Sequence, residues 1–418
     1  MDIRRIPLWE GRNAAVLTND LIRVVIEDRG AMALELSTEL SSGGRVNAHA
    51  LPWLRGTGTS VYSDENSDFR RNNSLFYQKA GSYFCFPNFG TACQNGEIFH
   101  ETDGYSANGY WMVERYGTDS MFGGAWILSS LTSREAGNRW KIHKVDLLLP
   151  GHPVLYTSCT ITNNGDRPLD ANAAWRNTLG SPFLESGCLL NSSAGQWMSI
   201  DQSLNGINGR IASDMPFDDL RKAPLKSGGT IDLTQITGMT GSTDLISGVV
   251  PETAKLGWNS VINPRLQLLY FTFFPGPVAQ EEGDLPLYFN HFLMDYGGRQ
   301  FTPWALYDGG TSQVFNLGCG SGTCYFGEGL ARSLTQTALM DRPTTVSLAP
   351  DETKTAWYAS ALVPYENPRI GGNFFAVEQV VEGIVAKRTK SWAFIPSDST
   401  FHCLRTITKT LLEEERNG

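Results

Sequence analysis

The sequence predicts an all-β protein, an antiparallel β-sandwich with loop insertions. Strand-like runs rich in β-branched and aromatic residues recur between residues 110 and 184, and each is bounded by Gly, Asn, Asp or Pro. Their spacing of roughly ten residues is typical of a sandwich. The chain also holds 43 glycines and 20 prolines, which supply turns, and helical periodicity is scarce.

The chain is long enough to bury a large core. It has 418 residues, of which 41% are apolar and 18% are charged, a composition that excludes disorder. Length alone suits two or three domains, but no linker or composition shift divides the sequence. We therefore predict one domain over residues 1–418, with an irregular insertion near residues 205–250.

Charge and cysteine usage exclude several classes of partner. The net charge is −9 and no basic stripe is present, so we expect no nucleic-acid partner. No apolar run approaches the ~20 residues that a membrane span needs, and the first residues lack the apolar stretch of a signal peptide. Seven scattered cysteines favour a reducing compartment over a disulfide scaffold. We expect a soluble, cytoplasmic protein away from membranes, whose oligomeric state the sequence leaves open.

The first third of the chain predicts a hairpin and an elaborated loop. Residues 14–37 contain two strand-like runs separated by a turn at residues 27–30. Residues 44–75 are polar and irregular with interspersed aromatics, which indicates a loop region beside a site. From residue 110 onward the strand runs follow one another, and residues 163–166, Asn-Asn-Gly-Asp, predict a tight turn.

The second half predicts an excursion, further strands and a terminal helix. Residues 205–250 are rich in Gly, Ser and Thr, with one short helical turn expected near residues 218–222. Strands resume at residues 266–276, 313–318, 323–329, 344–350 and 355–365, and the last residues of 401–418 favour a helix. No internal repeat of fixed period is visible.

Three patches of sequence resemble the galactose mutarotase-like (aldose 1-epimerase) superfamily. In residues 85–111 a Pro-Asn turn leads through a glycine-bearing loop to Asp103-Gly104 and an aromatic-led strand. In residues 160–184 a strand and an Asn-Gly-Asp turn lead to a second strand containing Arg176. The third patch runs from residue 323 to residue 365 and holds Glu328, followed by a Leu-Ala-Pro-Asp-Glu turn. The resemblance implies a galactose mutarotase-like β-sandwich and a sugar substrate.

The resemblance also implies catalytic positions. Mutarotation needs a base for the anomeric hydroxyl proton and an acid for the ring oxygen. Glu328 matches the family's catalytic glutamate, while Asp103 and Arg176 stand where the family has its two histidines, and Phe89 stands where it has an arginine. Arg176 cannot act as an acid near neutral pH, and Asp103 could do so only if burial raised its pKa. His100 could stand in for the missing imidazole, or it could be an ordinary loop histidine.

Several polar and aromatic residues near these patches could bind a sugar. Aromatic rings stack on the C–H faces of sugars while polar neighbours read the hydroxyl groups. Each candidate could instead have a structural role, since aromatics more often fill the core and Asn or Asp often make turns. The candidate substrate-binding residues are Asn108, Trp175, Asn177, Trp304 and Asp308.

No motif for a nucleotide, a metal or a serine nucleophile is present, so we expect no cofactor and no metal. The leading function is an enzyme of the aldose 1-epimerase kind, acting at or near the anomeric carbon of a small sugar or oligosaccharide. One alternative is a non-catalytic carbohydrate-binding protein on the same fold. Another is a lyase-type enzyme in which Arg176 clamps the carboxylate of an acidic sugar. The sequence does not name the sugar.

Overall fold

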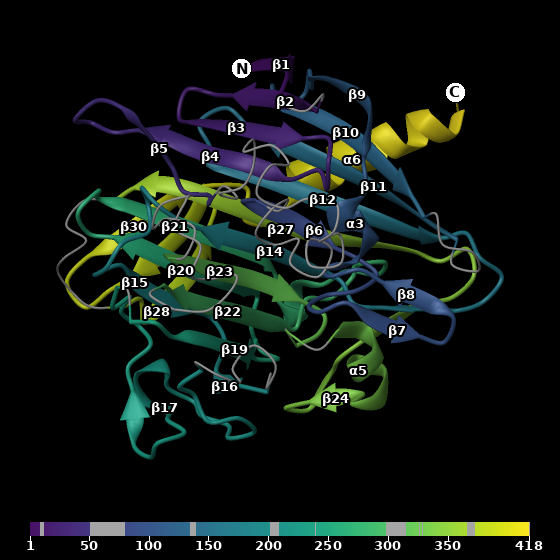
Figure 1. The fold of residues 1–418 in the computed structure, drawn as a ribbon. Helices are drawn as coiled ribbons and strands as arrows, with labels where there is room; N and C mark the ends of the chain where they lie inside the picture. The colour runs from purple at the N-terminus through teal and green to yellow at the C-terminus, as the bar shows by residue number, and fades with distance from the viewer. Residues whose placement is uncertain are drawn as a thin grey trace, which may run out of the picture.

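Two large antiparallel sheets lie face to face in the computed structural model of the chain (Figure 1). The structure describes residues 1–8, 12–50, 80–133, 139–200, 209–238, 240–297, 315–325, 327, 329–365 and 373–417. Large apolar side chains from both sheets fill the space between them, among them Trp175, Tyr270 and Tyr358. The predicted fold class, an antiparallel β-sandwich, is confirmed.

The front sheet has 11 strands and carries the residues of interest. Most of it is a continuous antiparallel array that runs from the N-terminal strands at one edge to strands from the middle of the chain at the other. Its order is β1 (Asp2–Pro7), β2 (Asn13–Thr18), β3 (Ile22–Glu27), β4 (Ala33–Glu39), β6 (Ser82–Cys85), β14 (Ala174–Leu179), β23 (Phe315–Gly322), β22 (Phe289–Tyr296), β19 (Thr243–Val249) and β16 (Gln196–Met198), and β5 (Arg45–Asn47) pairs with β4.

The back sheet has eight strands, and its central pairs are long and regular. Its order is β15 (Leu189–Ser192), β20 (Leu256–Asn263), β21 (Leu268–Pro275), β27 (Thr353–Pro364), β12 (Val154–Asn163), β11 (Trp140–Leu148), β10 (Ala125–Thr132) and β9 (Met112–Thr118). The four strand runs expected from residue 110 onward are β9 to β12.

The predicted turn at residues 163–166 joins two of the resembling patches. The Asn163 side chain accepts a hydrogen bond from the backbone of Gly165 at 2.9 Å and donates one to the carbonyl of Leu348 at 2.9 Å. The backbone of Asp351 donates to the Asn163 carbonyl at 2.9 Å. The Asn-Asn-Gly turn and the Leu-Ala-Pro turn are therefore bonded to each other although they lie far apart in sequence.

Four details differ from the sequence-based expectation. The segment 14–37 holds three strands, because Asn19 makes an additional turn by accepting from the backbones of Leu21 and Ile22. Strand β22 was not expected at all. The excursion expected over 205–250 ends sooner, since β19 begins at Thr243. The described part of the excursion contains the small strands β17 (Ala223–Pro224) and β18 (Thr230–Ile231). It also contains the expected helical turn, η4 (Leu220–Lys222). The strand expected at residues 323–329 does not form in the described part of that segment, because β23 ends at Gly322 and the helix α5 (Gly329–Thr335) begins at Gly329. The expected loop at 44–75 falls mostly outside the described residues.

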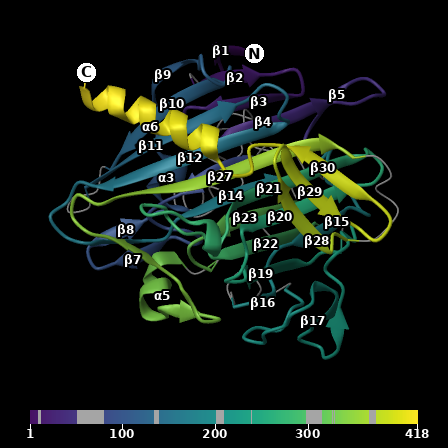
Figure 2. The same cartoon turned by 180° about the vertical axis from the view of Figure 1, so that it is seen from behind.

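A further layer covers the outer face of the back sheet (Figure 2). It consists of the small sheet β28 (Ala376–Val380), β29 (Gly383–Lys387) and β30 (Trp392–Pro396), followed by α6 (His402–Asn417). Its apolar side chains share a buried cluster with outward-facing residues of β12, β21 and β27.

No helix in the described parts of the chain is long and apolar enough to cross a membrane.

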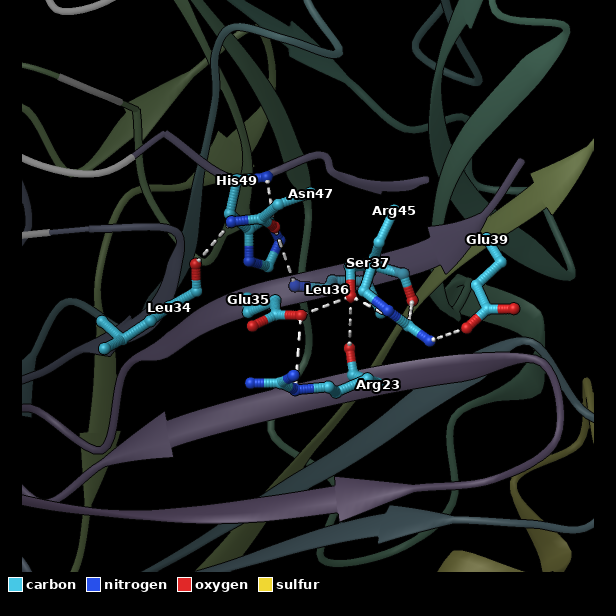
Figure 3. Close-up of polar contacts among 9 residues, drawn as sticks. All are labelled: Arg23, Leu34, Glu35, Leu36, Ser37, Glu39, Arg45, Asn47 and His49. Atoms are coloured by element: carbon cyan, nitrogen blue, oxygen red, sulfur yellow. Dashed lines mark hydrogen bonds and ion pairs between the residues drawn. The ribbon is translucent and has the colours of Figure 1, made fainter. Parts of the chain in front are cut away.

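A polar cluster fixes the end of the β4–β5 pair (Figure 3). The Asn47 side chain accepts a hydrogen bond from the Leu36 backbone at 3.0 Å and donates one to the Leu34 carbonyl at 3.1 Å. The amide thus bonds to β4 as the backbone of a paired strand residue would. It also accepts from the backbone of His49 at 3.1 Å. The His49 ring is 1% exposed and bonds the Ala33 carbonyl at 2.8 Å. Burial lowers the pKa of His49 from 6.5 to about 4, so the imidazole is neutral near pH 7.

Stability should therefore fall on acidification because of His49. Between pH 6.5 and about 4 the imidazole is protonated in the unfolded protein but stays neutral in the folded protein. The free energy of unfolding therefore decreases as the pH falls through this window. At pH 5 this protonation of the unfolded state lowers the free energy of unfolding by about 2 kcal/mol relative to its value at high pH. Urea unfolding at pH 7 and pH 5 should show the parent losing about that much more than His49→Gln.

The exposed His402 supplies the control for this measurement. His402→Gln should keep the pH dependence of the parent, because its side chain lies at the surface. An identical pH dependence in the parent and in His49→Gln would contradict the assignment.

Candidate functional site

A row of side chains crosses five adjacent strands on the outer face of the front sheet. Tyr83 on β6 lies opposite Arg176 on β14, and Gly320 on β23 lies opposite His291 on β22, which in turn lies opposite Ser247 on β19. A Cβ atom at Gly320 would come within 2.7 Å of the Trp175 carbonyl, so glycine permits the close approach of β23 to β14. The topology thus gathers residues from five strands that are separated in the sequence.

A loop residue completes this row with a negative charge. Asp103 follows β8 (Ile98–His100) and precedes the short helix α3 (Gly104–Asn108), and its backbone has a φ of 61°. Its carboxylate accepts from Arg176 Nη1 at 3.1 Å, from the Tyr83 hydroxyl at 3.1 Å and from the Gly90 backbone at 3.1 Å. Asp103 is 0% exposed and Arg176 is 5% exposed. This is a buried ion pair with further donors on its carboxylate.

The pair restricts the chemistry of its two members. Burial lowers the pKa of the Arg176 guanidinium, but Tyr83, Asp103 and Cys85 together raise it by more, so Arg176 stays charged. Burial raises the pKa of the Tyr83 hydroxyl well above its ordinary value, so this group acts as a hydrogen-bond donor. A carboxylate that accepts from three donors is not a proton donor. The geometry therefore gives Asp103 and Arg176 a positioning role and leaves proton transfer to other groups.

The Pro87-Asn88 turn connects this pair to the third patch. Asn88 donates to the carbonyls of Thr91 and Glu101, each at 2.9 Å, and accepts from the Leu330 backbone at 2.7 Å. Leu330 belongs to α5 (Gly329–Thr335).

Gly90 packs tightly against the same patch. A Cβ atom at Gly90 would lie 2.8 Å from the Gly327 backbone, and Thr91 donates to the Gly327 carbonyl at 2.9 Å. Glu328 itself lies outside the described residues, but Gly327 and Leu330, on either side of it, contact the loop that holds Asp103. The three patches of the resemblance therefore meet at one place.

His291 contributes an imidazole beside Arg176. It is 2% exposed, and its Nδ1 lies 2.9 Å from the Ser247 hydroxyl. Burial lowers its pKa from 6.5 to about 3, while a hydrogen bond to the backbone of Cys324 opposes the shift. The ring is therefore neutral near pH 7, and a neutral imidazole can donate at one nitrogen and accept at the other.

A small cavity lies between these groups. Its volume is about 10 Å³, room for a single water molecule, and its lining includes Phe89, Arg176, His291, Leu293 and Gly320. The Phe89 ring, at the position where the resemblance places an arginine, lies 5.2 Å from the His291 ring. A sugar ring would need this cavity to widen.

The structure places the other candidate residues differently. Because side chains alternate along a strand, Trp175 and Asn177 point to the opposite face from Arg176, into the space between the sheets. Trp175 is 1% exposed and stacks on Tyr358 at 4.9 Å, and Asn177 donates to the Tyr358 hydroxyl at 2.7 Å. Both side chains pack between the sheets, and sugar binding by them stays a prediction.

Asn108 and His100 lie close to the site in sequence. The Asn108 amide donates to the carbonyls of Thr102 and Gly104 at 2.9 and 2.7 Å, which fixes the turn around Asp103. His100 is 1% exposed at the end of β8, and its role stays a prediction. The candidates Trp304 and Asp308 lie outside the described residues.

The sequence reasoning missed His291 and Ser247. The signal that could have found His291 is weak, because the whole of β22 is buried and shows no alternation. Within the described ranges, no group of three or more His, Cys, Asp or Glu residues is arranged to hold a metal ion.

The fold is similar to that of solved structures of mutarotase-like proteins. A protein from Klebsiella pneumoniae, provisionally assigned as an aldose 1-epimerase, matches with a TM-score of 0.62 and 13% identity over 87% of this chain and 83% of that one. A galactose mutarotase-like protein from Clostridium acetobutylicum matches with a TM-score of 0.57 and 11% identity, over 87% and 99%. A galactose mutarotase related enzyme from Lactobacillus acidophilus matches with a TM-score of 0.52 and 9% identity, over 84% and 98%.

These similarities show that the chain has the galactose mutarotase-like fold, which confirms the resemblance at that level. Identities this low carry no conclusion about activity. No protein-family model matches the sequence, and the search of curated proteins found no relative.

Breaking the buried ion pair should destabilise the protein. Asp103→Asn leaves the Arg176 charge buried, and Arg176→Met leaves the Asp103 charge buried, so each should lower the free energy of unfolding by about 3–5 kcal/mol. The double variant removes both charges and should cost less than the sum of the two. Urea unfolding of the four proteins measures the coupling.

The exposed pair of Asp219 and Arg221, at 2.8 Å, serves as the matched control. Asp219→Asn should leave the unfolding midpoint close to that of the parent, because exposed ion pairs contribute little. If Asp103→Asn and Arg176→Met lowered the free energy of unfolding by strictly additive amounts in the double variant, the two side chains would not interact energetically, and the assignment would be wrong.

Proposed function

We propose that this protein binds a sugar on the outer face of the front sheet and acts at or near its anomeric carbon, as an aldose 1-epimerase does. The observation that carries the proposal is the meeting of three distant segments: the loop 87–103, strand β14 with Arg176, and the Gly327–Leu330 segment around Glu328. The same three segments carry the sequence resemblance, and the fold is that of mutarotase-like proteins.

In the proposed reaction Glu328 is the general base. It takes the proton of the hydroxyl group on C1 while an acid delivers a proton to the ring oxygen, the bond between C1 and the ring oxygen breaks, and an open-chain aldehyde forms. Rotation about the C1–C2 bond and reversal of these transfers close the ring on the other face. The net result is exchange of the two anomers.

We assign to His291 a hydrogen bond to the ring oxygen, while solvent water is the acid that supplies the proton, because a neutral imidazole does not give up a proton near pH 7. Asp103 and Arg176 are engaged with each other at 3.1 Å, so neither supplies the proton. The neutral His291 imidazole borders the same cavity as Arg176 and can donate a hydrogen bond as charge develops on the ring oxygen. The fixed positive charge of Arg176 would stabilise that developing negative charge.

The same geometry bears on the two alternatives. The lyase hypothesis requires Arg176 to hold a sugar carboxylate, but its Nη1 already holds Asp103. The hypothesis of a non-catalytic sugar-binding protein gains support from the buried ion pair that stands where the resemblance expects two histidines. The assay of anomer exchange separates this alternative from the enzyme.

Glu328→Gln should lower the rate of anomer exchange by ~10²–10⁴-fold while sugar binding is largely retained, because the amide keeps the shape but removes the basic oxygen. NMR exchange spectroscopy on a panel of neutral and acidic sugars measures the parent and the variant together.

The exposed Glu382 provides the control, since Glu382→Gln should exchange anomers at the parent rate. An active parent whose Glu328→Gln form keeps full activity would remove Glu328 from the mechanism. A parent that binds a sugar without accelerating exchange would establish the binding protein instead.

A further inference from the structure

We propose that the small sheet β28–β30 carries a second ligand site, for an acidic oligosaccharide, on the face that points away from the sandwich (Figure 2). This face borders a hollow of about 470 Å³, within the range of ~300–1,000 Å³ that is usual for small-molecule sites. Its lining includes Phe375, Val385, Lys387, Lys390 and Trp392. The site lies behind the back sheet, on the opposite side of the molecule from Arg176.

Strand alternation separates the two faces of the small sheet. Ile384 and Ala386 on β29, with Ala393 and Ile395 on β30, point inward and join the buried cluster over the back sheet. Val385 and Lys387 alternate with them and point outward, and Lys387 lies directly opposite Trp392 in the register. The outward face is therefore built on regular strands whose positions the inner face fixes.

Two large aromatic side chains on this face are exposed to solvent. Phe375 is 70% exposed and Trp392 is 63% exposed. Phe375 lies beside β29, since its backbone donates to the Lys387 carbonyl at 3.0 Å. Exposed rings of this size contribute little to the core, and grouped apolar exposure of this kind marks a binding surface. Flat ring faces are the surfaces on which the C–H faces of sugars stack.

The charge of the hollow selects an anionic ligand. The lining residues with a charge that the structure describes are Lys387, Arg388 and Lys390, all positive, in a protein whose net charge is −9. Lys387 is paired with Glu378 at 2.6 Å and Arg388 is 4% exposed, so the exposed ammonium group of Lys390 offers the excess positive charge to a ligand. Carboxylate or sulfate groups on a sugar chain would complement it while the sugar rings stack on the aromatics.

The turn that presents Lys390 is held in place from below. Arg388 is 4% exposed, its guanidinium lies 5.7 Å from the centre of the Tyr365 ring, and its backbone donates to the Ser391 carbonyl at 2.8 Å. The Tyr365 and Ser391 hydroxyls lie 3.0 Å apart. This support makes the turn between β29 and β30 a defined wall of the hollow, as a ligand site requires.

The test is isothermal titration calorimetry of the full chain with tetragalacturonate and a heparin tetrasaccharide as acidic probes and maltotetraose as the neutral probe. At least one acidic probe should bind more tightly than maltotetraose, and its affinity should fall with added salt. Trp392→Ala should weaken binding about tenfold, Trp392→Phe should retain most of it, and Lys390→Ala should weaken it several-fold and reduce the salt dependence.

Two further variants locate the bound probe on the molecule. Tyr110→Ala removes an aromatic side chain that is 61% exposed elsewhere and should leave binding unchanged. The inference does not rest on the proposed function, so His291→Asn, which alters the cavity of the front sheet, should also bind the acidic probe normally. Loss of binding in that variant would place the ligand at the sugar site of the front sheet and overturn the inference.

Three further results would overturn the inference. One is the absence of binding by both acidic probes, and another is binding that Trp392→Ala leaves unchanged. The third is a change of sedimentation coefficient in Trp392→Ala, which would identify the face as a contact between copies of the chain. Since Trp392 is mostly exposed, both Trp392 variants should fold as the parent does, and circular dichroism checks this.

Discussion

The buried ion pair between Asp103 and Arg176 is the constraint on which the site depends. Two charges removed from water are tolerated only when each stays with its partner, so the loop that carries Asp103 and strand β14 are fixed relative to each other. Asn88 and Gly90 extend that connection to the segment around Glu328. The cavity beside His291 borders this arrangement, because Arg176 is part of its lining.

Much of the fold could be predicted from the sequence, because turn residues separate its strands. The turn at 163–166 was correct, since Asn163 bonds three neighbouring backbone groups from inside it. Strand β22 was missed because all of its residues are buried, so it has neither alternation nor a polar face. The break between β2 and β3 was missed because a single side chain, Asn19, makes that turn without a glycine.

The site was predictable only in part. The resemblance selected Asp103 and Arg176, but these residues are 73 positions apart, so their contact can be recognised only when the spatial arrangement of the strands is known. Trp175, Arg176 and Asn177 are consecutive in a strand, so alternation alone could have shown that they cannot all face one site. Nothing local marks His291, whose place beside Arg176 depends on the pairing of β22 with β23 and on Gly320.

The most direct test of a sugar site on this face is NMR of the protein with labelled histidine side chains, with the His291 signal assigned by comparison with His291→Asn. The account predicts that a sugar that binds the protein, added from a panel of neutral and acidic monosaccharides, shifts the His291 signal and leaves that of the exposed His402 in place. Saturable binding of a monosaccharide that leaves His291 unperturbed would contradict the account.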